Sequence, residues 1–284
     1  MRVTCIIPSL NRACQLDLLL RSIRENWQMN DLDIHVIYKY DELEYLDGYA
    51  KISEDFPHIK WHAEDLGVFS DIIKNIIKKS KNSTIGFFVD DCVMFRKPSI
   101  SVTEVDRCVS IWNDMYVGFS LRLGQNTIVQ NYLTGELQHT LQAREVMYNV
   151  VEWNWKRYPR TSNYGYWFSW DGHFYSKELL TSDRVFSKYF GIHRDLEHQL
   201  ITDNELYVSL PNKMLACKAS SVFVNTVNTV QTDGAIPAGV KYGYSTKQLN
   251  DRFLAGDRIS LDSFTGHPII SCHEEFPLVW TGKI

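Results

Sequence analysis

Residues 84–91 (TIGFFVDD) form an apolar run that ends abruptly in two acids, Asp90 and Asp91. Short apolar runs of this kind are typical of strands that are buried on both faces, as in a parallel sheet. Because the run stops at two carboxylates, the strand is expected to end in a polar loop at one edge of the sheet. Residues 84–89 therefore predict a central strand.

The chain before this run repeats an order of strand, polar loop and helix. Residues 3–8 (VTCIIP) and 33–38 (DIHVIY) predict two more strands, and residues 59–62 are a candidate for another. Apolar residues recur at helical spacing over residues 16–27 and 68–79. This alternation predicts an α/β fold, a Rossmann-like, doubly wound, mostly parallel sheet with right-handed crossovers.

The second half of the chain is less regular. No sharp change in composition marks a boundary, so one continuous domain with an elaborated C-terminal half is expected. The aromatic-rich stretch 148–175 has two interpretations, platforms for sugar rings or core packing. Strands are predicted at 117–123, 172–175 and 222–225, and helices at 196–206 and 249–256.

Three polar loops follow the predicted strands of the first half. They contain residues 9–12 (SLNR), Asp41, and the pair Asp90-Asp91. In doubly wound sheets, ligands bind beyond the carboxyl ends of the strands, where such loops meet. The sequence therefore predicts that these loops converge on one site.

Asp90 and Asp91 are flanked on both sides by apolar residues. Burying two neighbouring carboxylates is costly unless a cation or hydrogen-bond donors compensate. A divalent ion that bridges a diphosphate would do so, and oxygen ligands suit Mg²⁺ or Mn²⁺. The alternative is a capped turn at the end of a strand.

The first loop, with Pro8, Ser9, Asn11 and Arg12, precedes a predicted helix whose N-terminus favours anions. Arg12 is a candidate to pair with phosphate, or to hold Asp41 or Asp91. A helix cap made by Ser9 or Asn11 is the competing interpretation.

Bulk composition narrows the class of protein. The chain has 284 residues and a formal net charge of −4, which argues against a nucleic-acid binder. Its six cysteines are scattered, which predicts no zinc site and no disulfide framework. No signal peptide or membrane-spanning run is evident, so a cytoplasmic protein is expected, with peripheral membrane contact still compatible.

The run ending in Ile-Pro-Ser-Leu-Asn-Arg (residues 7–12) resembles the opening of family 2-type glycosyltransferases of the GT-A fold, and residues 87–95 (FFVDDCVMF) resemble their D-x-D strand. The resemblance covers residues 1–95 well and the rest more loosely. This sequence differs from the D-x-D pattern at Cys92, because the third position of that pattern usually holds Asp. The resemblance implies Asp90 near the ribose or the metal, Asp91 on the metal and Asp41 near the base. It also implies a donor-binding half, residues 1–100, and an acceptor-binding half with a C-terminal tail, residues 101–284.

The same resemblance directs attention to two acids in the second half. Asp171, before a glycine and among aromatic residues, could bind sugar hydroxyls or act as a base, but it could also form a simple Asp-Gly turn. Related enzymes carry an acidic pair that opens a helix after this strand. Glu197 matches their base position better than Asp195, which could cap the helix, and a solvated helix is the alternative.

Near the C-terminus, His273 lies in a polar Cys-His-Glu-Glu segment between apolar residues. Several GT-A enzymes use a C-terminal histidine as a further metal ligand, so His273 joins Asp90 and Asp91 as a candidate. A stabilised core histidine is the alternative. A C-terminal ligand would also let the tail close over the donor.

These features predict a metal-dependent glycosyltransferase (EC 2.4) that takes a sugar from a nucleotide diphosphate, with UDP the commonest nucleotide of this type. The acceptor is expected to be a carbohydrate or glycolipid hydroxyl, the reaction inverting, and the cofactor Mn²⁺ or Mg²⁺. One alternative is a degenerate GT-A domain that binds nucleotide or glycan without turnover. A nucleotidyltransferase is disfavoured because residues 8–12 contain no glycine.

Overall fold

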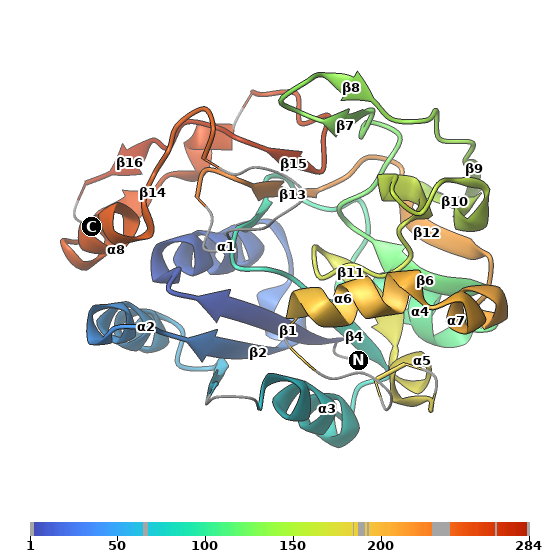
Figure 1. Cartoon of the computed structure of the whole chain (residues 1–284), viewed down its shortest axis with the longest axis horizontal. Helices are drawn as coiled ribbons and strands as arrows, with labels where there is room; N and C mark the ends of the chain where they lie inside the picture. Colours follow the sequence, from blue (N-terminus) through green and yellow to red (C-terminus); the bar gives the residue numbers. More distant parts are fainter. Residues whose placement is uncertain are drawn as a thin grey trace.

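The computed structural model describes residues 3–64, 68–183, 185–186, 191, 193–228, 239–264 and 266–282. A nine-stranded sheet runs through the molecule (Figure 1). In spatial order its strands are β3 (Lys60–Ala63), β2 (Leu32–Lys39), β1 (Val3–Leu10), β4 (Thr84–Phe87), β11 (His173–Ser176), β6 (Tyr116–Ser120), β12 (Lys213–Cys217), β10 (Val150–Asn154) and β9 (Arg144–Met147). Only β11 and β10 run opposite to the other strands of this sheet. The predicted α/β class with a mostly parallel sheet is confirmed.

The first four strands of this order are parallel and are joined by α1 (Ala13–Asn26), α2 (Leu43–Asp55) and α3 (Phe69–Lys79). Helices α1 and α3 lie on opposite sides of the sheet (Figure 1). Ile6 of β1 packs in one core cluster with Ile73 of α3, whereas its neighbour Ile7 packs in the other with Leu19 of α1. Both faces of β1 are therefore buried, which explains its continuous apolar sequence.

Strand β11 is inserted antiparallel between β4 and β6. A glycine allows this close approach, because a Cβ at Gly86 would lie 2.4 Å from Cε1 of Phe174. The insertion also places the loop before β11 beside the end of β4, where the Gly172 N–H donates to the carbonyl of Phe87 at 2.7 Å. Asp171 is thereby brought next to the Asp90-Asp91 loop.

A small second sheet continues this edge. It consists of β5 (Cys92–Met94), β13 (Val222–Asn225) and β15 (His273–Glu274), with β13 in the middle. Cys92 and His273 both lie opposite Val224 in the register of this sheet. The C-terminal segment is thus carried to the carboxyl end of β4.

Several shorter helices and strands surround these two sheets and are given at the end of this paragraph. All six cysteines are buried and are not joined in disulfides in the structure. Among the described residues, no helix has the length and apolar character needed to cross a membrane. The helices are α4 (Val102–Ile111), α5 (Lys177–Thr181), α6 (His193–Thr202), α7 (Asn204–Ser209), α8 (Thr246–Leu254), η1 (Met29–Asp31), η2 (Trp155–Arg157), η3 (Asn163–Gly165) and η4 (Leu261–Phe264), and the paired short strands are β7 (Val129–Asn131) with β8 (Glu136–Leu137) and β14 (Arg258–Ile259) with β16 (Trp280–Thr281).

The structure corrects one sequence-based expectation and decides between two interpretations of another segment. The helix predicted at 196–206 is two helices, because Asp203 ends α6 and caps α7 by accepting from the Leu206 N–H at 2.9 Å. Of the two interpretations of the aromatic-rich stretch 148–175, core packing holds for most of its large side chains, which are almost completely buried, whereas Tyr148 is 85% exposed. The most deeply buried are Trp153, Trp155, Tyr164, Trp167, Phe168, Trp170, Phe174 and Tyr175. They build the core beside β11.

Candidate functional site

The acidic pair after β4 is held by the loop after β1. The Arg12 guanidinium donates through Nη1 to Asp90 Oδ1 at 3.1 Å and to Asp91 Oδ2 at 2.7 Å. The other oxygen of Asp90, Oδ2, accepts from Ser9 Oγ at 2.8 Å and from the Leu10 N–H at 3.3 Å. Two loops about 80 residues apart in sequence therefore meet at one charged cluster, as the topology predicted.

The loop after β2 is tied to the same place by a reciprocal side-chain contact. Asn11 adopts a left-handed backbone conformation with φ of 58°, which asparagine tolerates better than most residues. Its Nδ2 donates to Asp41 Oδ2 at 2.8 Å, while its Oδ1 accepts from the Asp41 N–H at 3.0 Å. All three predicted loops thus converge on one edge of the sheet.

The competing interpretation of residues 9–12 as a helix cap is not what the structure has. Arg12 itself is the N-cap of α1, and no side chain caps this helix. Ser9 instead contacts the Tyr49 hydroxyl at 2.8 Å. Pro8 is buried within β1, opposite Ile37. Arg12 is further anchored by Nη2, which donates to the Asn228 carbonyl at 2.8 Å, so it joins the two halves of the chain.

The electrostatics of this cluster set Asp91 apart. Burial opposes ionisation of Arg12, but the charges of Asp91 and Asp90 outweigh it and raise its pKa, so the guanidinium is permanently charged. Burial, together with the charges of Asp90 and Asp171, raises the pKa of Asp91 to about 7 despite the neighbouring Arg12. The positive charge of Arg12 therefore does not fully stabilise the ionised form of Asp91, and a further cation nearby would stabilise it.

A second charged cluster lies next to it, built on the turn before β11. Asp171 Oδ2 accepts from Arg122 Nη1 at 3.0 Å and lies 3.5 Å from His273 Nε2. Burial opposes ionisation of Asp171, but the hydrogen bond from His273 and the charge of Arg122 prevail and lower its pKa. Asp171 is therefore an ionised carboxylate that is held on two sides.

Glu197, on α6, completes the group from a third direction. Its carboxyl accepts hydrogen bonds from the Ser169 hydroxyl and the Trp170 N–H. Burial and the nearby charge of Asp171 raise its pKa to about 8. Asp195, on the same helix, is exposed. The environments push the pKa values of Asp171 and Glu197 in opposite directions, a pattern typical of acid–base sites.

The predicted metal set of Asp90, Asp91 and His273 is not assembled. Among the described residues, no group of three or more His, Cys, Asp or Glu side chains is arranged to hold a metal ion. Both oxygens of Asp90 are already hydrogen-bonded, and the His273 Nε2 faces Asp171. Cys92 is fully buried in the core and cannot replace a ligand.

Asp91 nevertheless fits a divalent cation by itself. Its raised pKa favours a nearby positive charge, and its oxygen ligands are of the hard type that Mg²⁺ and Mn²⁺ prefer. Nucleotide-linked Mg²⁺ is commonly bound by one or two carboxylates together with substrate phosphates, not by a cage of protein ligands.

The sequence reasoning missed two residues that contact the charged clusters and one that holds the chain elsewhere in the second half. Arg122, Asn228 and Glu275 make contacts across the molecule that no local pattern reveals. For Arg122 a signal existed, because a lone arginine inside the apolar run 117–123 needs a buried partner. For Glu275 the signal was its place in the polar Cys-His-Glu-Glu segment.

Glu275 ties the C-terminal segment to the chain around residue 240. Its carboxylate accepts from the Tyr132 hydroxyl at 2.7 Å and from the N–H groups of Val240, Lys241 and Tyr242 at 2.9, 2.8 and 3.3 Å. The side chain is buried. Glu275 therefore holds residues 240–242 against the C-terminal segment.

Replacing Glu275 with Ala is expected to lower the free energy of unfolding by about 2–3 kcal/mol, because one hydroxyl and three backbone donors lose their acceptor. Urea denaturation followed by circular dichroism measures this. Glu274→Ala is the matched control, since the Glu274 Oε2 is buried without a hydrogen-bond partner. Equal destabilisation by the two variants would contradict the assigned role.

No protein-family model and no curated protein sequence matches this chain. Among solved structures, it is similar to S. aureus TarS (13% identity, TM-score 0.48, covering 79% of this chain and 36% of that chain). It is also similar to S. aureus TarS 1–349 in complex with UDP (11%, TM-score 0.46, 79% and 60%) and to the mannosyltransferase PcManGT from Pyrobaculum calidifontis in complex with GDP-Man and Mn²⁺ (14%, TM-score 0.32, 44% and 36%). The chain spans between 36% and 61% of the length of the TarS chains that it matches.

Proposed function

We propose that this chain is a glycosyltransferase of the GT-A type, which transfers a sugar from a nucleotide diphosphate to a carbohydrate or glycoconjugate hydroxyl. The observation that carries the proposal is one charged site with two parts. Asp91 and Arg12 lie at the carboxyl end of β4, and Asp171 and Glu197 lie beside them. In this proposal residues 1–100 bind the donor, and residues 101–284 bind the acceptor.

The donor side rests on the three converging loops. Arg12 is a fixed cation that is close to Asp91 and can face a diphosphate. Asp90 positions Arg12 and the loop after β1, while the Asn11–Asp41 pair shapes the place proposed for the nucleoside. Asp91 would hold Mn²⁺ or Mg²⁺ together with the donor phosphates, and the bound ion would supply positive charge to the leaving nucleotide diphosphate.

Of the two acids beside the donor side, Glu197 is the better general base. A base works best when its pKa lies near the working pH, and the pKa of Glu197 is raised to about 8, whereas that of Asp171 is lowered. Asp171, held by Arg122 and His273, is suited to accept hydrogen bonds from sugar hydroxyls. We therefore assign proton abstraction to Glu197 and orientation to Asp171.

The proposed reaction inverts configuration at the anomeric carbon. Glu197 removes the proton of the acceptor hydroxyl while the oxygen forms a bond to the anomeric carbon. The bond from that carbon to the diphosphate oxygen breaks, and the electron pair leaves with the nucleotide diphosphate. Desolvation around Glu197 makes its ionised form a stronger base than a carboxylate in water.

The alternative is a domain that binds a nucleotide or a glycan without turnover. The replacement of the third D-x-D position by the buried Cys92 favours it, because one expected oxygen ligand is missing. Release of nucleotide diphosphate from a donor separates the alternatives. Binding of the donor without release of nucleotide diphosphate would favour the binding domain over the enzyme.

A thermal-shift panel of UDP and GDP, with and without Mn²⁺, tests the proposal, since one solved structure similar to this chain contains UDP and another contains GDP-Man and Mn²⁺. The matching nucleotide diphosphate should raise the melting temperature increasingly with its concentration, and more strongly with Mn²⁺. The corresponding nucleotide sugar should then be hydrolysed slowly or transferred to an acceptor. No shift with any nucleotide diphosphate would refute the proposed donor site.

A further inference from the structure

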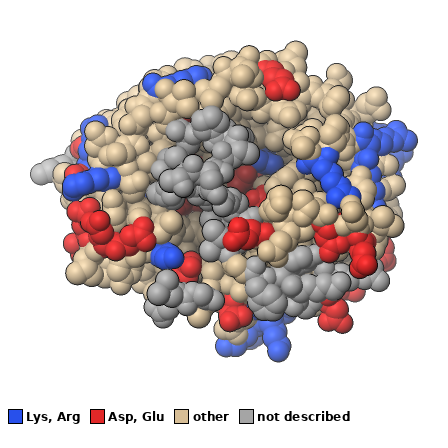
Figure 2. All heavy atoms as spheres, in the orientation of Figure 1, with Lys and Arg blue, Asp and Glu red and all other residues tan. Residues whose placement is uncertain are grey.

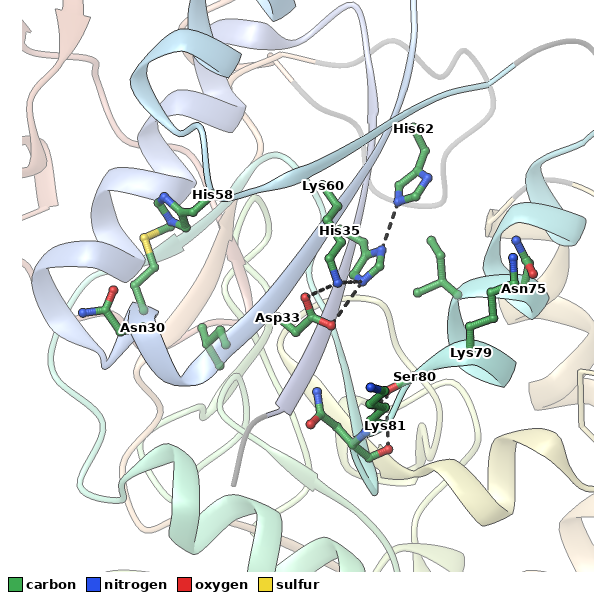
Figure 3. Close-up of a pocket in the computed structure, with 14 residues that line it drawn as sticks. Asn30, Asp33, His35, His58, Lys60, His62, Asn75, Lys79, Ser80 and Lys81 are labelled. Carbon is green, nitrogen blue, oxygen red and sulfur yellow. Dashed lines mark hydrogen bonds and ion pairs between the residues drawn. The ribbon is translucent and has the colours of Figure 1, made fainter.

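A cavity lies at the opposite edge of the sheet from Asp91. It has a volume of about 850 Å³ and opens at the amino ends of β2 and β3, beside the C-terminal end of α3 and the turn that follows (Figure 3). This size suits a ligand as large as a nucleotide or a phosphorylated sugar. The donor site proposed above is formed at the carboxyl ends of the same strands, so the two sites are separate.

The wall of this cavity is polar where a parallel sheet is normally apolar. His35 Nδ1 lies 3.0 Å from His62 Nε2, with the two rings stacked, and Lys60 Nζ lies 2.7 Å from Asp33 Oδ1. Ile37, two residues after His35 on the same face of β2, is buried in the core. Asp33, His35, Lys60 and His62 thus form a half-buried polar ladder across β2 and β3. Burying these polar side chains costs free energy that apolar residues would not cost, which indicates a function for them.

The cavity carries an excess of positive charge. Lys60 is neutralised by Asp33, whereas Lys79 and Lys81 are exposed and make no ion pair with any residue that the structure describes. Basic side chains gather at the lower rim of the molecule over α3 (Figure 2). Two lysines at one mouth attract a multivalent anion more strongly than a single charge does.

The histidines are neutral at pH 7 but can become charged. Burial is the main cause that lowers the pKa of His35, to about 4, and the charge of Lys60 adds to it. Burial and Lys60 also lower the pKa of His62. An anion in the cavity would oppose both effects, so its binding would be coupled to proton uptake. The other charged or titratable groups that line the cavity are Asp33, His58, Lys79 and Lys81.

We propose that this cavity is a second binding site, for a polyvalent phosphate such as a phosphate ester, held by Lys79 and Lys81 with His35 and His62 on the wall. Asn75 and Asn82 also line it and can bind the hydroxyl groups of such an ester. Binding strengthens as the pH falls, because each histidine that gains a proton adds a cation beside the ligand. The site is independent of the proposed donor site.

Titration calorimetry with inorganic tripolyphosphate, together with NMR of the histidine ring nitrogens, tests this proposal. We expect the His35 and His62 signals to shift on titration, and the affinity to rise as the pH falls below about 6.5, the ordinary pKa of histidine. The double variant Lys79→Ala/Lys81→Ala should lose about tenfold or more in affinity near pH 6.

The matched control is Lys78→Ala/Lys97→Ala, which removes the same charge from two exposed lysines that do not line the cavity. It should bind tripolyphosphate as the unaltered protein does. Binding at the Arg12 site alone would leave the His35 and His62 signals unmoved, and that result would overturn the proposal. Equal losses in the two double variants would also overturn it. In that case the polar ladder only protects the edge strand β3 from pairing with other chains.

Discussion

Asp91→Asn is expected to reduce sugar transfer by at least about 100-fold, the usual effect of removing one group that stabilises charge at a reacting centre. The amide keeps the shape of the side chain but lacks the negative charge that would hold a divalent ion against the donor diphosphate. Nucleotide diphosphate binding should lose its dependence on Mn²⁺ as well. Initial rates of nucleotide diphosphate release and calorimetric binding with and without Mn²⁺ measure the two effects.

The fold should survive this change, because Asp90 alone still accepts a hydrogen bond from Arg12. Asp114→Asn is the matched control, since Asp114 is exposed and lies outside the site. It should leave both rate and binding unchanged. An Asp91→Asn protein with full activity would refute the role of Asp91.

Glu197→Gln is expected to lower kcat by about 10²- to 10⁴-fold, the range typical of a general base. Gln retains the size of the side chain but cannot accept a proton from the acceptor hydroxyl. Donor binding should change little, since Glu197 lies on the acceptor side of the proposed site. Single-turnover rates and donor affinity separate the two quantities. Asp195→Asn, an exposed change on the same helix, should have no effect on either.

The pH dependence follows from the raised pKa of Glu197, which is about 8. The base must be ionised to act, so kcat/KM should rise with pH up to about pH 8, and the Gln variant should lack this rise. The folded protein keeps a proton that the unfolded chain releases above about pH 4.5. The free energy of unfolding should therefore fall between about pH 4.5 and pH 8, and Glu197→Gln should reduce that fall. A pH profile unchanged by the substitution would count against Glu197 as the base.

The first half of the fold could be predicted well from local patterns. Residues 3–8 and 84–89 are apolar on both faces, and only a strand within a covered sheet hides both faces at once. The position of Asp90 and Asp91 at a strand end follows from the abrupt change of polarity. Helix α3 could be predicted equally well from the sequence, because Ile73, Ile76 and Ile77 recur with the period of a helix.

The second half was harder because its decisive contacts are made by single residues. Asp203 divides a helix that the pattern predicted as continuous, and one capping hydrogen bond does this. Buried tryptophans beside β11 have the same composition as a sugar-binding surface, and burial alone distinguishes the two. Glu275 could not be separated from Glu274 in the sequence, although only Glu275 meets four donors.

By itself, the sequence determined the α/β class, the strands of the first half and the polar loops at their carboxyl ends, since hydrophobic periodicity is a property of neighbouring residues. Tertiary structure alone decided that Arg12 pairs with both Asp90 and Asp91 while no side chain caps α1, and that Asp171 and Glu197 lie close together with opposite pKa shifts. Those features depend on the order of strands in the sheet and on burial. Both arise from packing between segments that lie far apart in the chain, so no local pattern encodes them.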